Sequence, residues 1–170
     1  GGNLVASIQL QDGATNLGTI TYNFTTGAVS TLFTQNFDAV AAPALPAGWV
    51  ATTLAGSAPN WVTSVTTPNS APNDIFATDP AAVSDVVIET PTIAIASAGA
   101  SLSFKNNYNT ESGFDGGVLE ISINAAAYTD IITAGGVFTA NGYTGAISNA
   151  FGSPIGGRQA WTGNAGSYLT

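Results

Sequence analysis

Apolar and polar residues alternate along much of the chain with the two-residue period of a β-strand. The first alternating segment, residues 4–10, has an apolar residue at every second position. Asp12-Gly13 and the three residues after it form a connection, beyond which Ile20, Tyr22 and Phe24 repeat the pattern. Asp-Gly is a frequent turn pair between paired strands. The sequence therefore predicts an N-terminal two-strand unit within residues 1–30.

Short strands separated by turn residues are predicted for the remainder of the chain. They fall at residues 31–37, 49–50, 61–63, 86–89, 93–95, 102–108, 118–124, 128–132 and 137–139, and a Gly-rich tail follows that ends in Gln159-Ala160-Trp161. Residues 118–124 have the clearest pattern, with Leu119, Ile121 and Ile123 on one face. Glu120 then falls on the opposite, polar face.

Two stretches rich in Pro interrupt the predicted strands. They are assigned to loops, because Pro has no N–H group to donate to a strand ladder. They occupy residues 41–48 and 67–80. No window has the spacing of an amphipathic helix. The predicted class is all-β, and we expect residues 31–170 to form an antiparallel β-sandwich that resembles a jelly roll, preceded by the N-terminal strand pair.

Charge excludes several classes of partner. Lys105 and Arg158 are the only basic residues beside ten carboxylates, which gives a net charge of −8. Nucleic acids and anionic membrane surfaces require clustered cations, so neither is expected as a partner. No stretch approaches the roughly 18 consecutive apolar residues of a membrane helix, so membrane insertion is not expected either.

Three residue types are missing, and their absence narrows the chemistry. The chain has no His, Cys or Met. Histidine-based acid–base catalysis, thiol chemistry, disulfides and zinc sites are therefore excluded. A chain without Met is expected to begin at a processed end or inside a longer protein. Low charge with abundant Thr, Ser, Asn, Ala and Gly favours an exported bacterial protein, at the cell surface or extracellular.

Carboxylates are the remaining catalytic candidates, because glycosidases use two of them about 5–10 Å apart. Glu111, Asp115 and Glu120 form the nearest group in the sequence. Asp115 precedes two glycines in a predicted turn, and Glu120 lies on a polar strand face. Turn and surface roles are therefore favoured over catalysis. An enzyme that acts on glycosides is kept as a third hypothesis behind two non-catalytic ones.

Calcium binding is more plausible than catalysis, because hard cations prefer oxygen ligands that lie in loops. Asp38 is one candidate, and Asp74, Asp79 and Asp85 form another group. No EF-hand spacing is present. The alternative for these residues is ordinary turn chemistry beside Pro and Asn.

Aromatic residues offer a platform on which sugar rings could stack. The candidates are Trp49, Trp61, Trp161, Tyr108, Tyr143 and Tyr168. A core role is favoured for each Trp, because its large apolar body needs burial and its N–H needs one partner.

A resemblance to a known family emerges from motifs in the second part of the chain. These are Phe37-Asp38, Pro46-Ala47-Gly48-Trp49, Trp61-Val62-Thr63 and residues 115–122 and 157–163. Residues 33–170 resemble a jelly-roll accessory domain of secreted and cell-surface bacterial proteins, similar to cleaved-adhesin and MAM-like β-sandwich domains. The resemblance implies a calcium site to which Asp38 contributes. It also implies further closing strands, which would follow Thr170 and are not in this sequence.

A sandwich without its last strands exposes an open edge, whereas residues 1–30 supply a spare strand pair. These are the two halves of strand complementation, in which each copy fills the next. The first hypothesis is a non-catalytic adhesive or structural module that forms filaments by head-to-tail strand exchange. The second is a calcium-assisted carbohydrate-binding module of a secreted hydrolase or protease, with a surface glycan or protein as partner. Residues 1–30 are alternatively the tail of a preceding module.

Overall fold

The computed structural model describes residues 2–170, and all of its strands are paired antiparallel in twos. The strands are β1 (Asn3–Asp12), β2 (Thr15–Thr25), β3 (Val50–Ala55), β4 (Val62–Ser64), β5 (Asp74–Phe76), β6 (Asp85–Glu89), β7 (Glu120–Ile121), β8 (Thr129–Asp130), β9 (Gly145–Ala146) and β10 (Gln159–Ala160). The sheets are β1–β2, β3–β6, β4–β5, β7–β8 and β9–β10.

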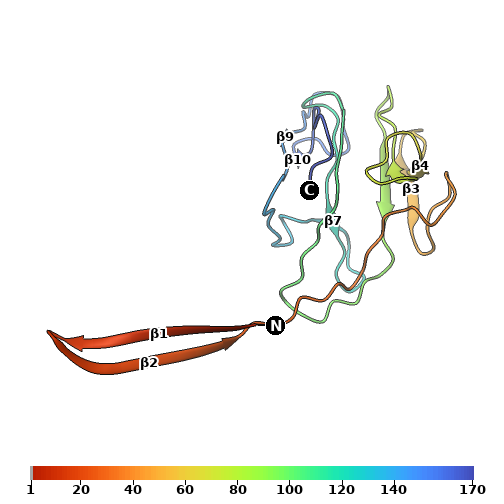
Figure 1. Cartoon of the computed structure of the whole chain (residues 1–170). Helices are drawn as coiled ribbons and strands as arrows, with labels where there is room; N and C mark the ends of the chain where they lie inside the picture. Colours follow the sequence, from red (N-terminus) through yellow and green to blue (C-terminus); the bar gives the residue numbers. More distant parts are fainter. Residues whose placement is uncertain (1) are drawn as a thin grey trace. The chain divides into compact units, whose positions relative to one another are not determined.

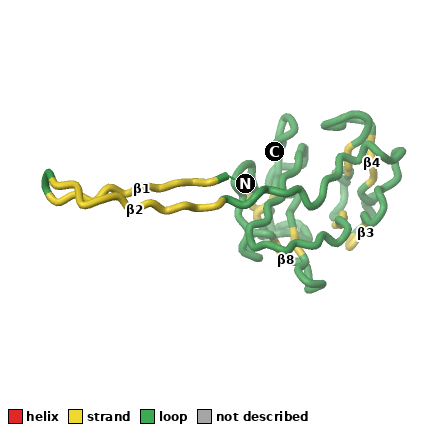
Figure 2. The backbone as a smooth tube through the Cα atoms, turned by 60° about the horizontal axis from the view of Figure 1, so that its bottom comes forward, coloured by secondary structure: helices red, strands yellow, loops and turns green. Residues whose placement is uncertain are grey.

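The described residues contain no helix, as Figure 2 shows, so the predicted all-β class is confirmed. It follows that no helix among them is long and apolar enough to cross a membrane. The sheets are small and none of them closes on itself. The jelly-roll sandwich stays a prediction.

The chain divides into two compact units, Gly1–Thr34 and Gln35–Thr170. We call them the N-terminal unit and the C-terminal unit. The sequence places the corresponding boundary after residue 30. Figure 1 shows β1 and β2, in red, as the two strands of the N-terminal unit. All other strands belong to the C-terminal unit.

Strands β1 and β2 form a hairpin, and their ladder is longer than that of any other strand pair among the described residues. Their register runs from Asn3 opposite Thr25 to Asp12 opposite Thr15, with one irregularity at Leu10/Gln11. The connecting turn is two residues long, and its first residue, Gly13, has a φ of 58°. Glycine adopts this left-handed conformation without steric cost, which explains why the turn falls here.

An aromatic cluster around Trp161 forms the densest packing in the C-terminal unit. The Trp161 ring meets Tyr143 at 4.9 Å, Phe138 at 5.4 Å and Phe104 at 5.7 Å, in each case edge to face. Its indole N–H donates to the carbonyl of Asn141 at 2.9 Å. Trp161 is only 6% exposed, so its predicted core role is confirmed.

Backbone contacts between Trp161 and the segment around Gly117 also hold the cluster in place. Gly117 and Trp161 exchange two hydrogen bonds of 2.9 Å each. A Cβ atom on the neighbouring Gly116 would lie 2.5 Å from the Trp161 carbonyl oxygen. Only glycine allows this approach, so the Gly-Gly pair serves packing as well as the predicted turn.

Several predicted strands are wrong. Residues 31–37, 93–95 and 137–139 form no strand, and residues 102–108 contribute only an isolated bridge from Asn106 to Leu169. Residues 118–124 are reduced to the two residues of β7. Alternation fixes which side chains share a face, but a strand also needs a neighbouring backbone in register.

Candidate functional site

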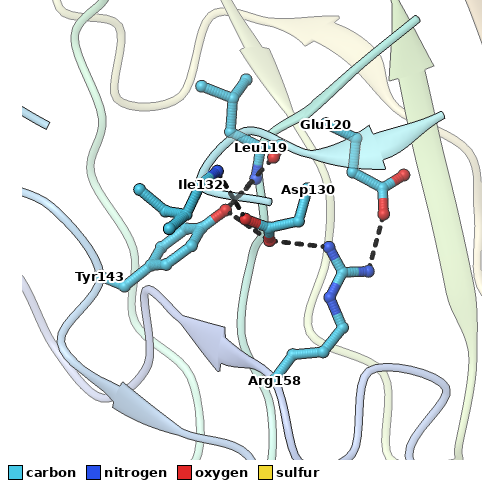
Figure 3. A network of polar contacts seen from close by, with 6 residues as sticks. All are labelled: Leu119, Glu120, Asp130, Ile132, Tyr143 and Arg158. Carbon is cyan, nitrogen blue, oxygen red and sulfur yellow. Dashed lines mark hydrogen bonds and ion pairs between the residues drawn. The ribbon is translucent and has the colours of Figure 1, made fainter. Parts of the chain in front are cut away.

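An ion-pair network joins the two strands of the β7–β8 sheet to the segment before β10. Arg158 contacts Glu120 Oε1 at 2.7 Å through Nη1 and Asp130 Oδ2 at 2.9 Å through Nη2 (Figure 3). Glu120 and Asp130 are directly opposite each other on the paired strands. Two facing carboxylates repel each other, so Arg158 is needed to hold this register.

Tyr143 and two backbone amides complete the network, as Figure 3 shows. The Tyr143 hydroxyl lies 3.0 Å from Asp130 Oδ2 and accepts from the Leu119 amide at 2.9 Å. The Ile132 amide donates to Asp130 Oδ1 at 3.0 Å. Each oxygen of Asp130 therefore has a donor.

The electrostatics of this network oppose proton transfer near neutral pH. Burial raises the pKa of Asp130, but hydrogen bonds from Arg158, the Ile132 amide and Tyr143 outweigh it and hold the pKa below its ordinary value. Burial, together with the hydrogen bond to Asp130, raises the pKa of Tyr143 to about 12, against a lowering effect of the Leu119 amide. Burial lowers the pKa of Arg158, but its two carboxylate partners more than compensate. An acid–base catalyst needs a pKa near the working pH, so these groups fit a structural role.

An open groove of about 490 Å³ lies beside the network. Its lining residues are Asp130, Ile132, Thr133, Phe138, Gly142, Tyr143, Arg158 and Gln159. Aromatic rings next to planar polar groups are the chemistry that holds a sugar ring, whose faces are apolar and whose rim carries hydroxyls. The groove is therefore a candidate for binding a small ligand in the C-terminal unit.

The carboxylates of the predicted catalytic group have different surroundings. Glu120 is half-buried and forms an ion pair with Arg158 that the sequence did not predict. Asp115 and Glu111 share a turn, in which the Asp115 amide donates to the Glu111 carbonyl at 3.0 Å. They lie near Asp79, whose pKa is raised by burial and by these two charges. The unexpected partner is Arg158, and its only sequence signal is that it is one of two cations.

Asp38 lies in a loop where hydrogen-bond donors surround its carboxylate. Oδ1 accepts from the Asn73 amide at 3.0 Å, and Oδ2 accepts from Asn36 Nδ2 at 2.7 Å and Ser70 Oγ at 3.3 Å. The buried Asn73 side chain donates in turn to the carbonyls of Phe37 and Val40. These contacts fasten two loops together.

A hard cation requires a shell of oxygen acceptors. The donors around Asp38 fit a loop clasp and not such a shell. Within residues 2–170, no group of three or more acidic side chains is placed to hold a metal ion. Calcium binding at Asp38 stays a prediction.

The second group of calcium candidates is divided between two strands and a loop, which contains Asp79. Asp74 is in β5 and Asp85 is the first residue of β6. Asp74 Oδ2 accepts from the Tyr168 hydroxyl at 2.6 Å. Burial, followed by this hydrogen bond, raises the pKa of Tyr168 to about 12. Asp74 thus anchors the C-terminal segment.

The other Trp residues also serve packing. Trp49 is half-buried and meets the Phe37 ring at 4.9 Å, edge to face. Trp61 is half-buried, and its indole N–H donates to the Val86 carbonyl in β6 at 3.2 Å. The motifs from which the family resemblance was inferred therefore include packing contacts.

The hairpin carries the largest unpartnered surface of the N-terminal unit. All residues of β1 and β2 are exposed. One face pairs Leu4 with Phe24 and Ile8 with Ile20, and these apolar side chains remain 42–60% exposed. We call this the apolar face; its residues are Leu4, Ala6, Ile8, Leu10, Ile20, Tyr22 and Phe24.

The opposite face of the hairpin is mostly polar. Its cross-strand pairs include Ser7 with Thr21 and Gln9 with Thr19. Asp12, beside the turn, is the only charged residue before Asp38. A ribbon with a single charge and one apolar face is suited to binding another protein surface.

No protein-family model, curated protein or solved structure matches this chain. The resemblance to jelly-roll accessory domains stays an expectation from the motifs alone. Functional inference therefore depends on the two surfaces described above, the hairpin and the groove beside Arg158.

Proposed function

We propose that this chain is a non-catalytic structural or adhesive module that assembles with further copies of itself through its N-terminal hairpin. The observation that carries the proposal is the full exposure of both hairpin strands together with their apolar face. A two-stranded hairpin is marginal in water unless something covers its apolar side. A covering partner would stabilise it.

The low charge favours close contact between copies. Only 7% of residues are charged, so an interface desolvates few ions. The net charge of −8 supplies a mild repulsion that salt would screen. Assembly should therefore strengthen as ionic strength rises.

The proposed location is the bacterial cell surface or the extracellular space, and the proposed complete fold is a jelly-roll-like sandwich. Support comes from the all-β class and from the composition, which is poor in charge and free of Cys. Head-to-tail docking does not close on itself, so assembly would give filaments.

A concentration series of the purified chain tests this function. We expect the mass by light scattering to rise with concentration and filaments to appear by negative-stain microscopy. Ile8→Thr with Phe24→Thr, on the apolar face, should weaken assembly at least tenfold. Gln9→Thr with Thr21→Ser, on the polar face, is the matched control and should retain it. A single 17.0 kDa species at every concentration and salt level would refute the proposal.

A second candidate function is carbohydrate binding, with the groove beside Arg158 as the favouring observation. Neutral glycans are expected in preference to acidic ones, because the single charge of Arg158 is already paired with two carboxylates. Retention on a glycan array should fall in Gln159→Ala and persist in Gln9→Ala, which lies outside the groove. Equal binding by both variants, or none by the parent chain, would remove this candidate.

A further inference from the structure

Two segments of the C-terminal unit have the sequence of a strand and no strand partner. Residues 92–96 carry Ile93 and Ile95 at alternate positions, and residues 101–105 carry Leu102 and Phe104. Among the residues that the structure describes, neither segment makes a backbone hydrogen bond. Both segments are therefore loops.

Three of the four apolar side chains that alternate in these segments are also exposed, whereas Ile93 is half-buried. Leu102 is 68% exposed, and Ile95 and Phe104 are exposed as well. Phe104 nevertheless contacts the core, because its ring meets that of Trp161 at 5.7 Å. Residues 101–105 therefore lie at the margin of the aromatic cluster. A strand added there would extend the core outward.

The hairpin offers the unpaired strand edges with which these segments could pair. Each of its strands has one neighbour, so the outer edges of β1 and β2 offer unpaired N–H and C=O groups. Its apolar face repeats with the same two-residue period. β1 has 10 residues and β2 has 11, long enough to span either five-residue segment.

We infer that the hairpin of one copy docks by strand addition on residues 92–96 and 101–105 of a second copy. This inference deepens the proposed function and rests on it. Backbone hydrogen bonds would supply the pairing, and the apolar face would lie beside Ile95, Leu102 and Phe104 in the extended sheet.

Charge is compatible with this contact. Residues 92–104 contain no charged side chain, and Lys105 ends the second segment. The hairpin carries only Asp12, of the opposite sign. Docking therefore brings no like charges together and desolvates at most one ion of each sign.

Cross-linking between copies tests the docking surface, and the absence of Cys makes introduced thiols unambiguous. The full chain carrying Ile8→Cys is mixed with isotope-labelled chain carrying Leu102→Cys or Ile95→Cys, allowed to assemble and oxidised. Mass spectrometry should find at least tenfold more mixed disulfide than with Val137→Cys. That control residue is 81% exposed in the same unit.

Three outcomes would overturn the inference. Assembly without excess mixed disulfide, but with Ile8→Cys linking to itself, would show that hairpins stack on hairpins, and the proposed function would stand. A disulfide inside one chain of Ile8→Cys/Leu102→Cys, independent of concentration, would show that the hairpin docks on its own chain. Failure to assemble at all would refute the proposed function together with the inference.

Proline substitution provides a second measurement that does not depend on the exact register. Successive amides of a strand point to opposite edges, so Leu102→Pro and Ser103→Pro are both made. One of them should weaken assembly at least tenfold, whereas Leu102→Ala or Ser103→Ala, which keeps the amide, should weaken it less. Dilute samples should melt as the parent does, because these amides bond to no backbone group in the single chain. Unchanged assembly in both Pro variants would contradict the inference.

Discussion

The hairpin and the C-terminal unit differ in the interactions that stabilise them. The hairpin has the longest ladder of the protein and no buried residue. The C-terminal unit has strands of two to six residues, but it contains the aromatic cluster and the Arg158 network. Regular hydrogen bonding and burial are thus found in different parts of the chain.

This difference shows that regular secondary structure alone does not make a segment stable without a partner. Backbone hydrogen bonds exchange protein partners for water and contribute little net free energy, whereas burial of apolar surface is the dominant favourable term. The C-terminal unit carries its own buried cluster. The hairpin should depend on a covering surface, and the same substitution should therefore have different consequences in the two units.

The largest contrast is expected between two isoleucines. Ile147 is 2% exposed in the C-terminal unit, whereas Ile8 is 53% exposed in the hairpin. Ile147→Ala should lower the free energy of unfolding by about 2–5 kcal/mol because it leaves a cavity. Ile8→Ala should change it by less than about 0.5 kcal/mol in dilute samples while weakening assembly. Urea unfolding followed by Trp fluorescence measures both, and equal effects would contradict the comparison.

A smaller effect is expected when the Arg158 network is opened. Arg158→Met should cost about 1–2 kcal/mol, less than a fully buried pair because its members are partly exposed. Lys105→Met, at the other cation, is the control and should stay within about 0.5 kcal/mol.

Acid titration sharpens this prediction. The pKa of Asp130 is lowered in the folded state, so its contribution to stability is present above the ordinary Asp value of about 3.9 and is lost as the pH falls through the folded pKa. Loss of stability on acidification should be shallower in Arg158→Met. An identical acid slope in parent and variant, measured by urea unfolding between pH 2 and pH 7, would argue against the network.

Tyr143→Phe should have an effect of about 1 kcal/mol at neutral pH, through lost hydrogen bonds to Leu119 and Asp130. The pKa of Tyr143 is raised to about 12, above the ordinary value of about 10. Its contribution is therefore complete below pH 10 and is lost as the pH rises toward 12. Stability should fall less steeply over that window in Tyr143→Phe, while Tyr22→Phe in the hairpin, whose residues are all exposed, should change the free energy of unfolding at neutral pH by less than about 0.5 kcal/mol.

The smallest effect is expected for calcium. Because donors surround Asp38, melting temperatures with calcium and with chelator should agree within about 1 °C. Asp38→Asn should lower the melting temperature equally in both, since its amide would face the donors of Asn36 and Asn73. A calcium-dependent rise that Asp38→Asn abolishes would establish the predicted metal site.

The hairpin was the most predictable element because all of its determinants are local. Alternation at residues 4–10 and the Asp12-Gly13 turn are adjacent in sequence, and the ladder needs no distant partner. β6 was predicted nearly as well, because residues 86–88 are all β-branched. In contrast, β5 lies inside a stretch assigned to loop, and residues 93–95 remained unpaired.

The candidate site was less predictable because its members are distant in sequence. Arg158 meets Glu120 across 38 positions and Asp130 across 28. Nothing in the local pattern distinguishes Glu120 from a solvated carboxylate. The Trp161 core role could be anticipated, since a large aromatic body in a chain without Met needs burial.

By itself, the sequence determined the all-β class, the hairpin, the acidic character and the exclusion of His, Cys and Met chemistry. These properties follow from composition and from side-chain alternation, which act over a few residues. Only the tertiary structure decided which carboxylates face Arg158, which rings surround Trp161 and which alternating segments find a partner. Those outcomes depend on contacts between segments that are distant in the chain. Local alternation of apolar and polar residues does not specify which segments pair, or in which register.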